Sequence, residues 1–485
     1  MEQPATNDII EVCRGQDFFL GVFNDRGFSG LIVLLDKEFH FVFNETAMIA
    51  FKVENLIRVG NKIVCYDMRQ FVAVGAELPD DKILYDMKLL YGYVDSVFEL
   101  ATKELGPIAD VLSEQERRLK ANVKACKMAR VDVNSHPISS LIPSSLLRRV
   151  VRLRAMATMA LYEKALRTRS DAINTFETSG YSFARALYHV ERNGTFIDVP
   201  YAEEQLKKSH PPHISKFFRS VLETNTDGIV YTKFNPIGGK TGRIKVDRGF
   251  NCLGIAHGEP REAIVSRFEG GLIYSFDFNA IDYRCIVASV DDPEFVKLYD
   301  DCDDFHQRTA SFFFGDKVDE LRRKVIKECT YVVAYGGTES TVSNKTGLST
   351  AKAAEVIEML NEKLGPVARL RSELYARAMR DGYVETPDGR RIPVASDDHP
   401  GKVLGLYAQS YSSHVFERAF VAVEKLMNGM KSKLMFTVHD ELVADMHPEE
   451  FGKAPLIKQT MESANGGIDL SVSANEGKDY GEASK

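Results

Sequence analysis

The sequence lacks the features that would place the protein in a membrane or an oxidising compartment. No apolar run approaches the ~18–20 residues of a transmembrane helix, and the opening MEQPATNDII is not a signal peptide. The seven cysteines include no CxxC pair, so neither a zinc site nor a disulfide framework is indicated. We therefore expect a cytoplasmic protein (host cytoplasm if its source is viral) with no membrane partner.

Positive charge is not in excess either, because the formal net charge is −7. Such a total does not exclude nucleic acid as a partner, since one cleft can concentrate cations while the remaining surface stays acidic. Internal repeats and low-complexity tracts are absent from the sequence. The length of 485 residues predicts two to four domains with ample core.

Residues 321–337, LRRKVIKECTYVVAYGG, carry cations and then aromatic rings at every fourth position, namely Arg323, Lys327, Tyr331 and Tyr335. In an α-helix a step of four residues turns by about 400° and rises about 6 Å, so these side chains form one stripe. Gly336-Gly337 is expected to stop the helix. Such a stripe can bind a triphosphate and stack a base. A solvated edge that grades into core has the same spacing, so both interpretations stay open.

Two further segments carry carboxylates at the ends of apolar runs. LIYSF predicts a buried strand that ends near Asp277, and KLMFTVHDELVADM (433–446) predicts a β-hairpin with His439, Asp440 and Glu441 at its turn. Phosphoryl transfer by two metals needs carboxylates that converge on ions about 3.5–4 Å apart. Asp277 and Asp440 on neighbouring strands would meet that need. The alternative interpretation is a strand terminator and a polar turn.

Together and in this order, the three segments resemble the family A DNA polymerases, typified by bacterial DNA polymerase I and its phage relatives. The family's three motifs stand here as DFNAIDYR (277–284), the stripe from Arg323 to Gly336, and VHDE (438–441). Connecting segments are similar too, namely FNPIGGKTGR (234–243), DFHQRTA (304–310) and GYVETPDGRRIPV (382–394). The resemblance is dense from about residue 185 to 447.

The resemblance implies a role for each matching residue. The two Mg²⁺ ions would be held by Asp277, Asp440 and the backbone carbonyl of Phe278, with Glu441 as a supporting catalytic carboxylate. The incoming dNTP would meet Arg323, Lys327, Tyr331, His306, Asp282 and Tyr335. Primer-template DNA would contact Arg243, Gln409, His439 and Arg284.

Four positions depart from the family pattern. Asp282 stands where the family usually has a glutamate that excludes the ribose 2′-OH, so weaker rejection of ribonucleotides is expected. Ala280 replaces the motif's glutamine, and Gly405 replaces an asparagine that contacts the minor groove. Tyr331 replaces the phenylalanine of many relatives, which by analogy predicts efficient termination by dideoxynucleotides.

The N-terminal third resembles the family's 3′–5′ exonuclease only weakly. Asp67 matches its second motif and Asp86 a later aspartate loosely, but FFLGVFNDRGFSG (18–30) lacks the Asp-x-Glu of the first motif. Arg154 stands where the third motif needs an acid. Because one carboxylate cannot hold two divalent ions, we predict a domain without proofreading chemistry. An active exonuclease with relocated ligands is the alternative.

The expected fold is an α/β ribonuclease-H-like N-terminal domain followed by an α+β right-hand polymerase with palm, fingers and a reduced thumb. The predicted domains are 1–165 (degenerate exonuclease-like), 166–228 (reduced thumb and connecting helices) and 229–485 (palm and fingers, the fingers at about 304–382). Only about thirty residues separate Asp198 from Ile229, too few for long thumb helices. We therefore expect low intrinsic processivity, and with it a processivity or replisome partner. Ser349 is expected to cap a helix, and the C-terminal tail is expected to fray.

The predicted function is template-directed DNA synthesis without proofreading, in the replication of a phage or other mobile replicon. Repair in a cell is an open alternative role. A single-subunit RNA polymerase is a second hypothesis, because those enzymes share the acidic, cationic and tyrosine positions. A catalytically silent, polymerase-derived DNA-binding protein is the third. Primer extension with dNTPs and Mg²⁺ separates the three.

Overall fold

The computed structural model describes residues 6–25, 28–35, 38–92, 97–105, 114–115, 117–118, 121, 144–299, 302, 304–335, 337–464 and 466–484. The chain divides into two compact units, Met1–Tyr188 and His189–Lys485. The predicted domain boundaries remain predictions. The first of them, at 165/166, falls inside a helix that runs unbroken over Ser144–Thr168.

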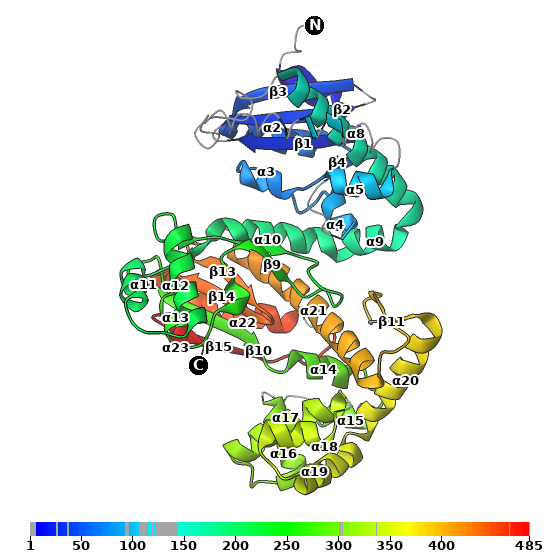
Figure 1. Ribbon diagram of the computed structural model, residues 1–485, viewed down its shortest axis with the longest axis vertical. Coiled ribbons are helices and arrows are strands. Elements are labelled where there is room, and N and C mark those ends of the chain that lie inside the picture. The colour runs from blue at the N-terminus through cyan, green and yellow to red at the C-terminus, as the bar shows by residue number, and fades with distance from the viewer. Residues whose placement is uncertain are drawn as a thin grey trace. The chain divides into compact units, whose positions relative to one another are not determined.

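The first unit contains a mixed five-stranded sheet (Figure 1). Its strands are β1 Phe18–Asp25, β2 Phe28–Leu35, β3 Glu38–Glu45, β4 Ile63–Cys65 and β5 Leu84–Asp86. They lie in the order β3-β2-β1-β4-β5, in which β1, β2 and β3 pair antiparallel while β4 pairs parallel with both β1 and β5. The two parallel pairs require crossovers, so β4 and β5 bring their carboxyl ends to the same edge.

Helices cover this sheet and connect it to the second unit. They are α1 Thr6–Val12, α2 Thr46–Val59, α3 Arg69–Ala73, α4 Met87–Leu90, α5 Val97–Glu104, α8 Ser144–Thr168, α9 Ser170–Thr175, the π-helical turn η1 Phe176–Gly180, and α10 Tyr181–Asn193. Ala155 of α8 packs on Phe19, Ile32 and Leu34, so α8 covers one sheet face. Helix α2 packs on β2 and β3.

The second unit is built on an antiparallel four-stranded sheet in the order β13-β14-β10-β15. Its strands are β10 Leu272–Phe278, β13 Lys433–Val438, β14 Glu441–Met446 and β15 Val472–Gly477. The predicted strand and hairpin are thus confirmed. The expectation of a frayed tail is wrong, because β15 pairs with β10 along its length and Tyr480 is fully buried. The pattern of alternating polar residues hid this edge strand.

The segment that leads into this sheet contains short elements. They are β6 Thr195–Phe196, α11 Val199–Leu206, α12 Pro212–Thr224, β7 Ile229–Val230, β8 Thr232–Asn235, β9 Lys245–Gly249, η2 Cys252–Gly254 and α13 Glu259–Glu262. Helices α11 and α12 are 8 and 13 residues long. Strand β8 pairs antiparallel with β9, and the loop between them carries Arg243.

The helices between β10 and β13 form a lobe with its own apolar core, and the long helix α21 runs from this lobe to the sheet (Figure 1). They are α14 Ile281–Ala288, α15 Pro293–Lys297, α16 Phe305–Phe314, α17 Glu320–Ala334, α18 Glu339–Thr346, α19 Thr350–Lys363, α20 Gly365–Asp381 and α21 Pro400–Met427, with the ribbon β11 Tyr383–Glu385 and β12 Arg391–Pro393. The η3 turn Pro448–Lys453, α22 Ala454–Ser463 and α23 Tyr480–Ala483 complete the unit.

Local signals at helix ends behave as the sequence predicts. The Ser349 side chain accepts a hydrogen bond from the Lys352 N–H and caps α19. Helix α17 ends at Ala334, and the Gly337 N–H donates to the Val332 carbonyl at 2.7 Å, which closes the helix end. Gly336, part of the predicted helix stop, lies outside the described residues. The helices that the structure describes are too short or too polar to cross a lipid bilayer.

Candidate active site

The predicted carboxylates meet at the ends of adjacent strands. Strands β10 and β14 pair with Asp277 directly opposite Glu441, and Asp440 lies in the two-residue turn that joins β13 to β14. The backbone N–H of Phe278 donates to the Asp440 carbonyl at 3.4 Å, which ties the strand end to the turn. Asp277, Phe278 and Asp440 therefore occupy one corner of the sheet.

The turn itself is strained. His439 adopts a left-handed backbone conformation with φ of 59°, which suits a two-residue hairpin but is uncommon for a residue other than glycine. Ala280, two residues beyond β10, is also left-handed, with φ of 56°. Non-glycine residues in this region cost free energy and concentrate at functional sites, so both sides of the corner carry that signature.

The two aspartates at this corner have raised pKa values. Burial, together with the charges of Asp440 and Glu441, raises the pKa of Asp277 to about 7, although part of its surface reaches solvent. The Lys327 ammonium acts in the opposite direction, which puts this cation within electrostatic range of the strand end. Burial and then the charge of Asp282 raise the pKa of Asp440 to about 6. A bound cation would relieve both effects.

Glu441 is arranged differently from the two aspartates. Its Oε1 accepts a hydrogen bond from the Ser275 hydroxyl at 2.6 Å, and its Oε2 accepts one from the Tyr480 hydroxyl at 2.9 Å. Both carboxylate oxygens are therefore engaged by the protein. In this structure Glu441 supports the corner from within the core, and its predicted catalytic contribution remains a prediction.

The residues at the corner suit Mg²⁺, an ion that binds through one or two carboxylates completed by water and substrate phosphates. Asp277 and Asp440 supply two hard oxygen ligands, and the Phe278 carbonyl belongs to the same strand end. No group of three or more His, Cys, Asp or Glu side chains arranged to hold a metal occurs among the residues that the structure describes.

The predicted stripe on α17 is present, with Lys327 exposed and Arg323, Tyr331 and Tyr335 half-buried. The Tyr331 and Tyr335 rings stack with centroids 6.2 Å apart and planes 26° apart, and Tyr283 meets Tyr331 edge-on at 5.9 Å. Arg323 donates from Nε to Asp304 Oδ2 at 2.6 Å, and Asp304 also caps α16. The stripe therefore runs from an ion-paired arginine to a ladder of aromatic rings.

His306, in the first turn of α16, lies beside this stripe. Its ring centroid is 5.7 Å from that of Tyr331, and its buried Nδ1 has no hydrogen-bond partner among the described residues. Burial and the charges of Lys327 and Arg323 lower the pKa of His306 to about 4. His306 is thus a neutral imidazole near two cations, with one buried ring nitrogen that has no hydrogen-bond partner among the described residues.

Asp282, at the start of α14, is held by two other elements. Arg243 Nη2 lies 2.8 Å from each carboxylate oxygen of Asp282, and the hydroxyl of Ser412 on α21 donates to Oδ1. His439 lies next to this network with much of its surface exposed. The shielding of the remainder and the charge of Arg243 lower the pKa of its imidazole. The structure thus brings Arg243, Asp282 and His439 together, with Ser412, a residue that no sequence motif marks.

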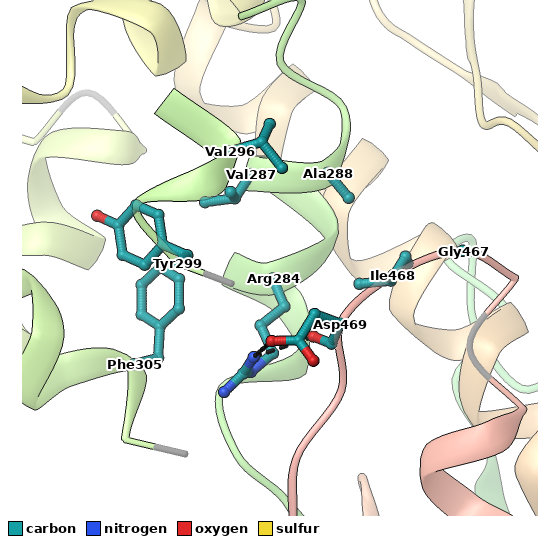
Figure 2. Close-up of a pocket in the computed structure, with 9 residues that line it drawn as sticks. All are labelled: Arg284, Val287, Ala288, Val296, Tyr299, Phe305, Gly467, Ile468 and Asp469. Atoms are coloured by element: carbon teal, nitrogen blue, oxygen red, sulfur yellow. Dashed lines mark hydrogen bonds and ion pairs between the residues drawn. The ribbon is translucent and has the colours of Figure 1, made fainter. Parts of the chain in front are cut away.

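Arg284 does not join them. Its side chain is 3% exposed and donates to the carbonyls of Asn279, Cys302 and Asp469. It borders a cavity of about 130 Å³, where it points toward Asp469 (Figure 2). In this structure its guanidinium holds α14 to the loop before β15, and the DNA contact expected of Arg284 remains a prediction.

Gln409 lies half-buried on α21, one turn before Ser412. On the same helix, Gly405 faces the Tyr335 ring, and a Cβ built there would lie 3.6 Å from the nearest ring carbon. The ring therefore occupies space beside the position where relatives carry asparagine. The DNA-binding role of Gln409 remains a prediction.

Paired strand-end carboxylates opposite a helix of cations and tyrosines are the kind of arrangement that metal-dependent nucleotidyl transfer requires. Comparison with known proteins gives the family. Residues 160–482 match DNA polymerase family A, which is two thirds of the chain. The chain belongs to this family.

Individual relatives agree. A DNA polymerase of Mycobacterium phage D29 is 31% identical over 183 residues, 37% of this chain and 30% of the relative. The thermostable DNA polymerase I of Thermus aquaticus is 26% identical over 329 residues, 61% of this chain and 39% of the relative. The chain thus spans well under half of the curated relatives it matches.

A solved structure shares the fold. The polymerase domain of Pol1 from M. smegmatis, in complex with DNA primer-template and dNTP, superposes with a TM-score of 0.76 over 100% of both chains at 17% sequence identity. At this identity the likeness establishes the architecture alone.

Proposed function

We propose that this protein is a template-directed DNA-dependent DNA polymerase that adds dNTPs to a primer 3′ end. The observation that carries the proposal is the meeting of Asp277 and Asp440 at one sheet corner, within electrostatic range of Lys327 on the α17 stripe. The complex of the structural neighbour with primer-template and dNTP supports the same partners for this chain.

The chain's residues divide the work. Asp277 and Asp440 would hold Mg²⁺, and the bound ions would supply activation of the primer hydroxyl and charge stabilisation of the leaving oxygen. Arg323, Lys327 and neutral His306 orient the triphosphate, because most of the catalysis of phosphoryl transfer is positioning and charge neutralisation. The Tyr331–Tyr335 ladder stacks the nucleotide base, while base pairing with the template supplies sequence.

We further propose that the N-terminal unit is a ribonuclease-H-like, degenerate exonuclease domain without proofreading activity. The mixed sheet order supports this. Lys88 Nζ lies 3.3 Å from Asp67 Oδ2, and Asp86 accepts hydrogen bonds from the N–H groups of Met68 and Leu89 at 2.8 and 3.1 Å. The carboxylates at the ends of β4 and β5 are therefore engaged by protein donors.

A reduced thumb belongs to the same proposal. Helices α11 and α12, of 8 and 13 residues, fill the segment between Asp198 and Ile229. Helices this short offer little surface to grip duplex behind the active site. Low intrinsic processivity follows, and with it the need for a partner that holds the DNA during replication.

Primer extension tests the proposal. The wild-type protein with a primed template, four dNTPs and Mg²⁺ is expected to elongate the primer, and Asp277→Asn is expected to reduce the rate by at least about a thousandfold, since one of two metal carboxylates is lost. Substituting rNTPs distinguishes an RNA polymerase. A wild-type protein that binds primed DNA but never elongates it would favour the silent DNA-binding alternative.

A further inference from the structure

The network around Asp282 has a member that no motif marks. Ser412 is 3% exposed, lies on the long helix α21, and donates its hydroxyl to Asp282 Oδ1. The hydroxyl also lies 3.2 Å from the Gln409 carbonyl, but the bond to the charged carboxylate is the stronger one. Arg243, the other partner of Asp282, has a side chain that is 37% exposed.

The two hydrogen-bond partners of Asp282 differ in how firmly they are fixed by the surrounding protein. Arg243 comes from the loop before β9 and reaches solvent, so its guanidinium is available to other anions such as nucleic-acid phosphates. Ser412 is fixed by the backbone of a packed helix and buried. When Arg243 turns to another partner, Ser412 is the donor that continues to orient the carboxylate.

The location of Asp282 predicts which part of a bound nucleotide would lie beside it, namely the sugar. Arg243, which binds Asp282, lines one small cavity with His439 and Asp440, and Tyr283, the residue after Asp282 in α14, meets the Tyr331 ring edge-on at 5.9 Å. Asp282 therefore lies between the metal corner and the stacked rings of Tyr331 and Tyr335. A nucleotide with phosphates at the first and its base at the second must place its sugar between them, beside Asp282.

We propose that Ser412 is a positioning residue for sugar selection, acting through its hydrogen bond to Asp282. This inference rests on the proposed polymerase function and deepens it. Ser412 holds the short aspartate side chain in one orientation, so that the carboxylate occupies the space that a 2′-OH would enter. Arg243 and Ser412, the two partners of Asp282, also line one small cavity of about 20 Å³ together with His439 and Asp440.

Single-nucleotide insertion opposite template thymine tests the inference, with kcat/KM measured for dATP and for ATP. Ser412→Ala releases one bond to Asp282 while Arg243 still holds the carboxylate, and we expect the dATP/ATP preference to fall about three- to tenfold, the range of one ordinary hydrogen bond. Ser412→Thr keeps the hydroxyl and should keep the preference. Ser413→Ala is the matched control, because Ser413 bonds Glu417 rather than Asp282.

A second comparison uses the length of the acid. Glutamate at position 282 extends the side chain by about 1.5 Å toward the Ser412 hydroxyl, which already makes a short contact. Asp282→Glu and Ser412→Ala should therefore be non-additive, with the double variant at least about threefold more selective than the product of the single effects.

The possible results distinguish a failure of the Ser412 inference from a failure of the proposed function. A wild-type protein that elongates primers while Ser412→Ala keeps the dATP/ATP preference within twofold would overturn the inference and leave the proposed function intact. Equal losses for Ser412→Ala and Ser413→Ala would also overturn it, because that result indicates general damage to α21. A wild-type protein that inserts neither nucleotide overturns the proposed function, and the inference with it.

Discussion

Replacing Asp440 by asparagine should stabilise the protein while abolishing nucleotide addition. Asp440 is largely enclosed, and its pKa is raised from 3.8 to about 6 by burial and by the charge of Asp282. An acid whose pKa is higher in the folded state is preferred in its neutral form there. The wild-type protein therefore loses stability as pH rises above the unfolded value, and the loss is complete above the folded pKa.

The size of the effect follows from that shift. A rise in pKa from 3.8 to about 6 corresponds to about 3 kcal/mol at pH 8 and to about half of that at pH 5. Asparagine has the same shape and carries no charge, so Asp440→Asn should recover up to this free energy. The melting temperature should rise by several degrees at pH 8 in metal-free buffer, and by less at pH 5.

Calorimetric unfolding with EDTA at the two pH values measures this, and primer extension at pH 8 measures activity. Mg²⁺ should raise the melting temperature of the wild-type protein and leave that of Asp440→Asn unchanged. Asp445→Asn is the matched control, on the strand β14 that follows the turn. Asp445 is fully buried and bonded to Arg267 and Ser266, so its replacement should destabilise the protein. A gain for Asp440→Asn that is absent at pH 8, or equal at both pH values, would refute the reasoning.

Three further predictions concern single side chains. Tyr331→Phe should lower termination by dideoxynucleotides relative to dNTP addition by about tenfold, the value of one hydrogen bond, and unchanged termination ladders on a sequencing template would contradict the role. Lys88→Met removes the ammonium partner of the half-buried Asp67 and should destabilise the N-terminal unit by about 1–3 kcal/mol in urea unfolding, with partial recovery on adding Asp67→Asn; if that second change brings no recovery, the ion pair is not the cause. Because burial lowers the pKa of His306 to about 4, the imidazole is neutral from pH 6 to 8, so the ratio of kcat/KM between the wild-type protein and His306→Asn should stay constant over that range. A ratio that changes about tenfold would show that the ring ionises there.

Local patterns in the sequence predict several elements of this structure and which side chains share a face. The apolar run before Asp277 and the two runs around His439-Asp440 predict the strands and the hairpin, because strand formation and turn chemistry depend on neighbouring residues. The four-residue spacing on α17 likewise predicts which side chains share a face. The expectation that the strand before Asp277 and the hairpin at Asp440 are neighbours came from the resemblance to the family's motifs.

Contacts between distant segments are what the sequence could not supply. Ser412 and Asp282 are 130 positions apart, and nothing in the neighbourhood of either marks a hydrogen bond between them. Arg284 matches the family motif, yet its guanidinium turns to carbonyls from two loops that the motif does not contain. Strand β15 escaped prediction because an edge strand with polar residues resembles a loop until its partner is known.

The strand that carries Asp277 is enclosed by two strands that come much later in the sequence, β14 and β15. During synthesis, β10 leaves the ribosome more than 150 residues before its neighbours, since β14 begins at Glu441 and β15 at Val472. The acidic corner cannot assemble until both have emerged. A nascent chain therefore lacks the complete corner until Gly477, the last residue of β15, has left the ribosome.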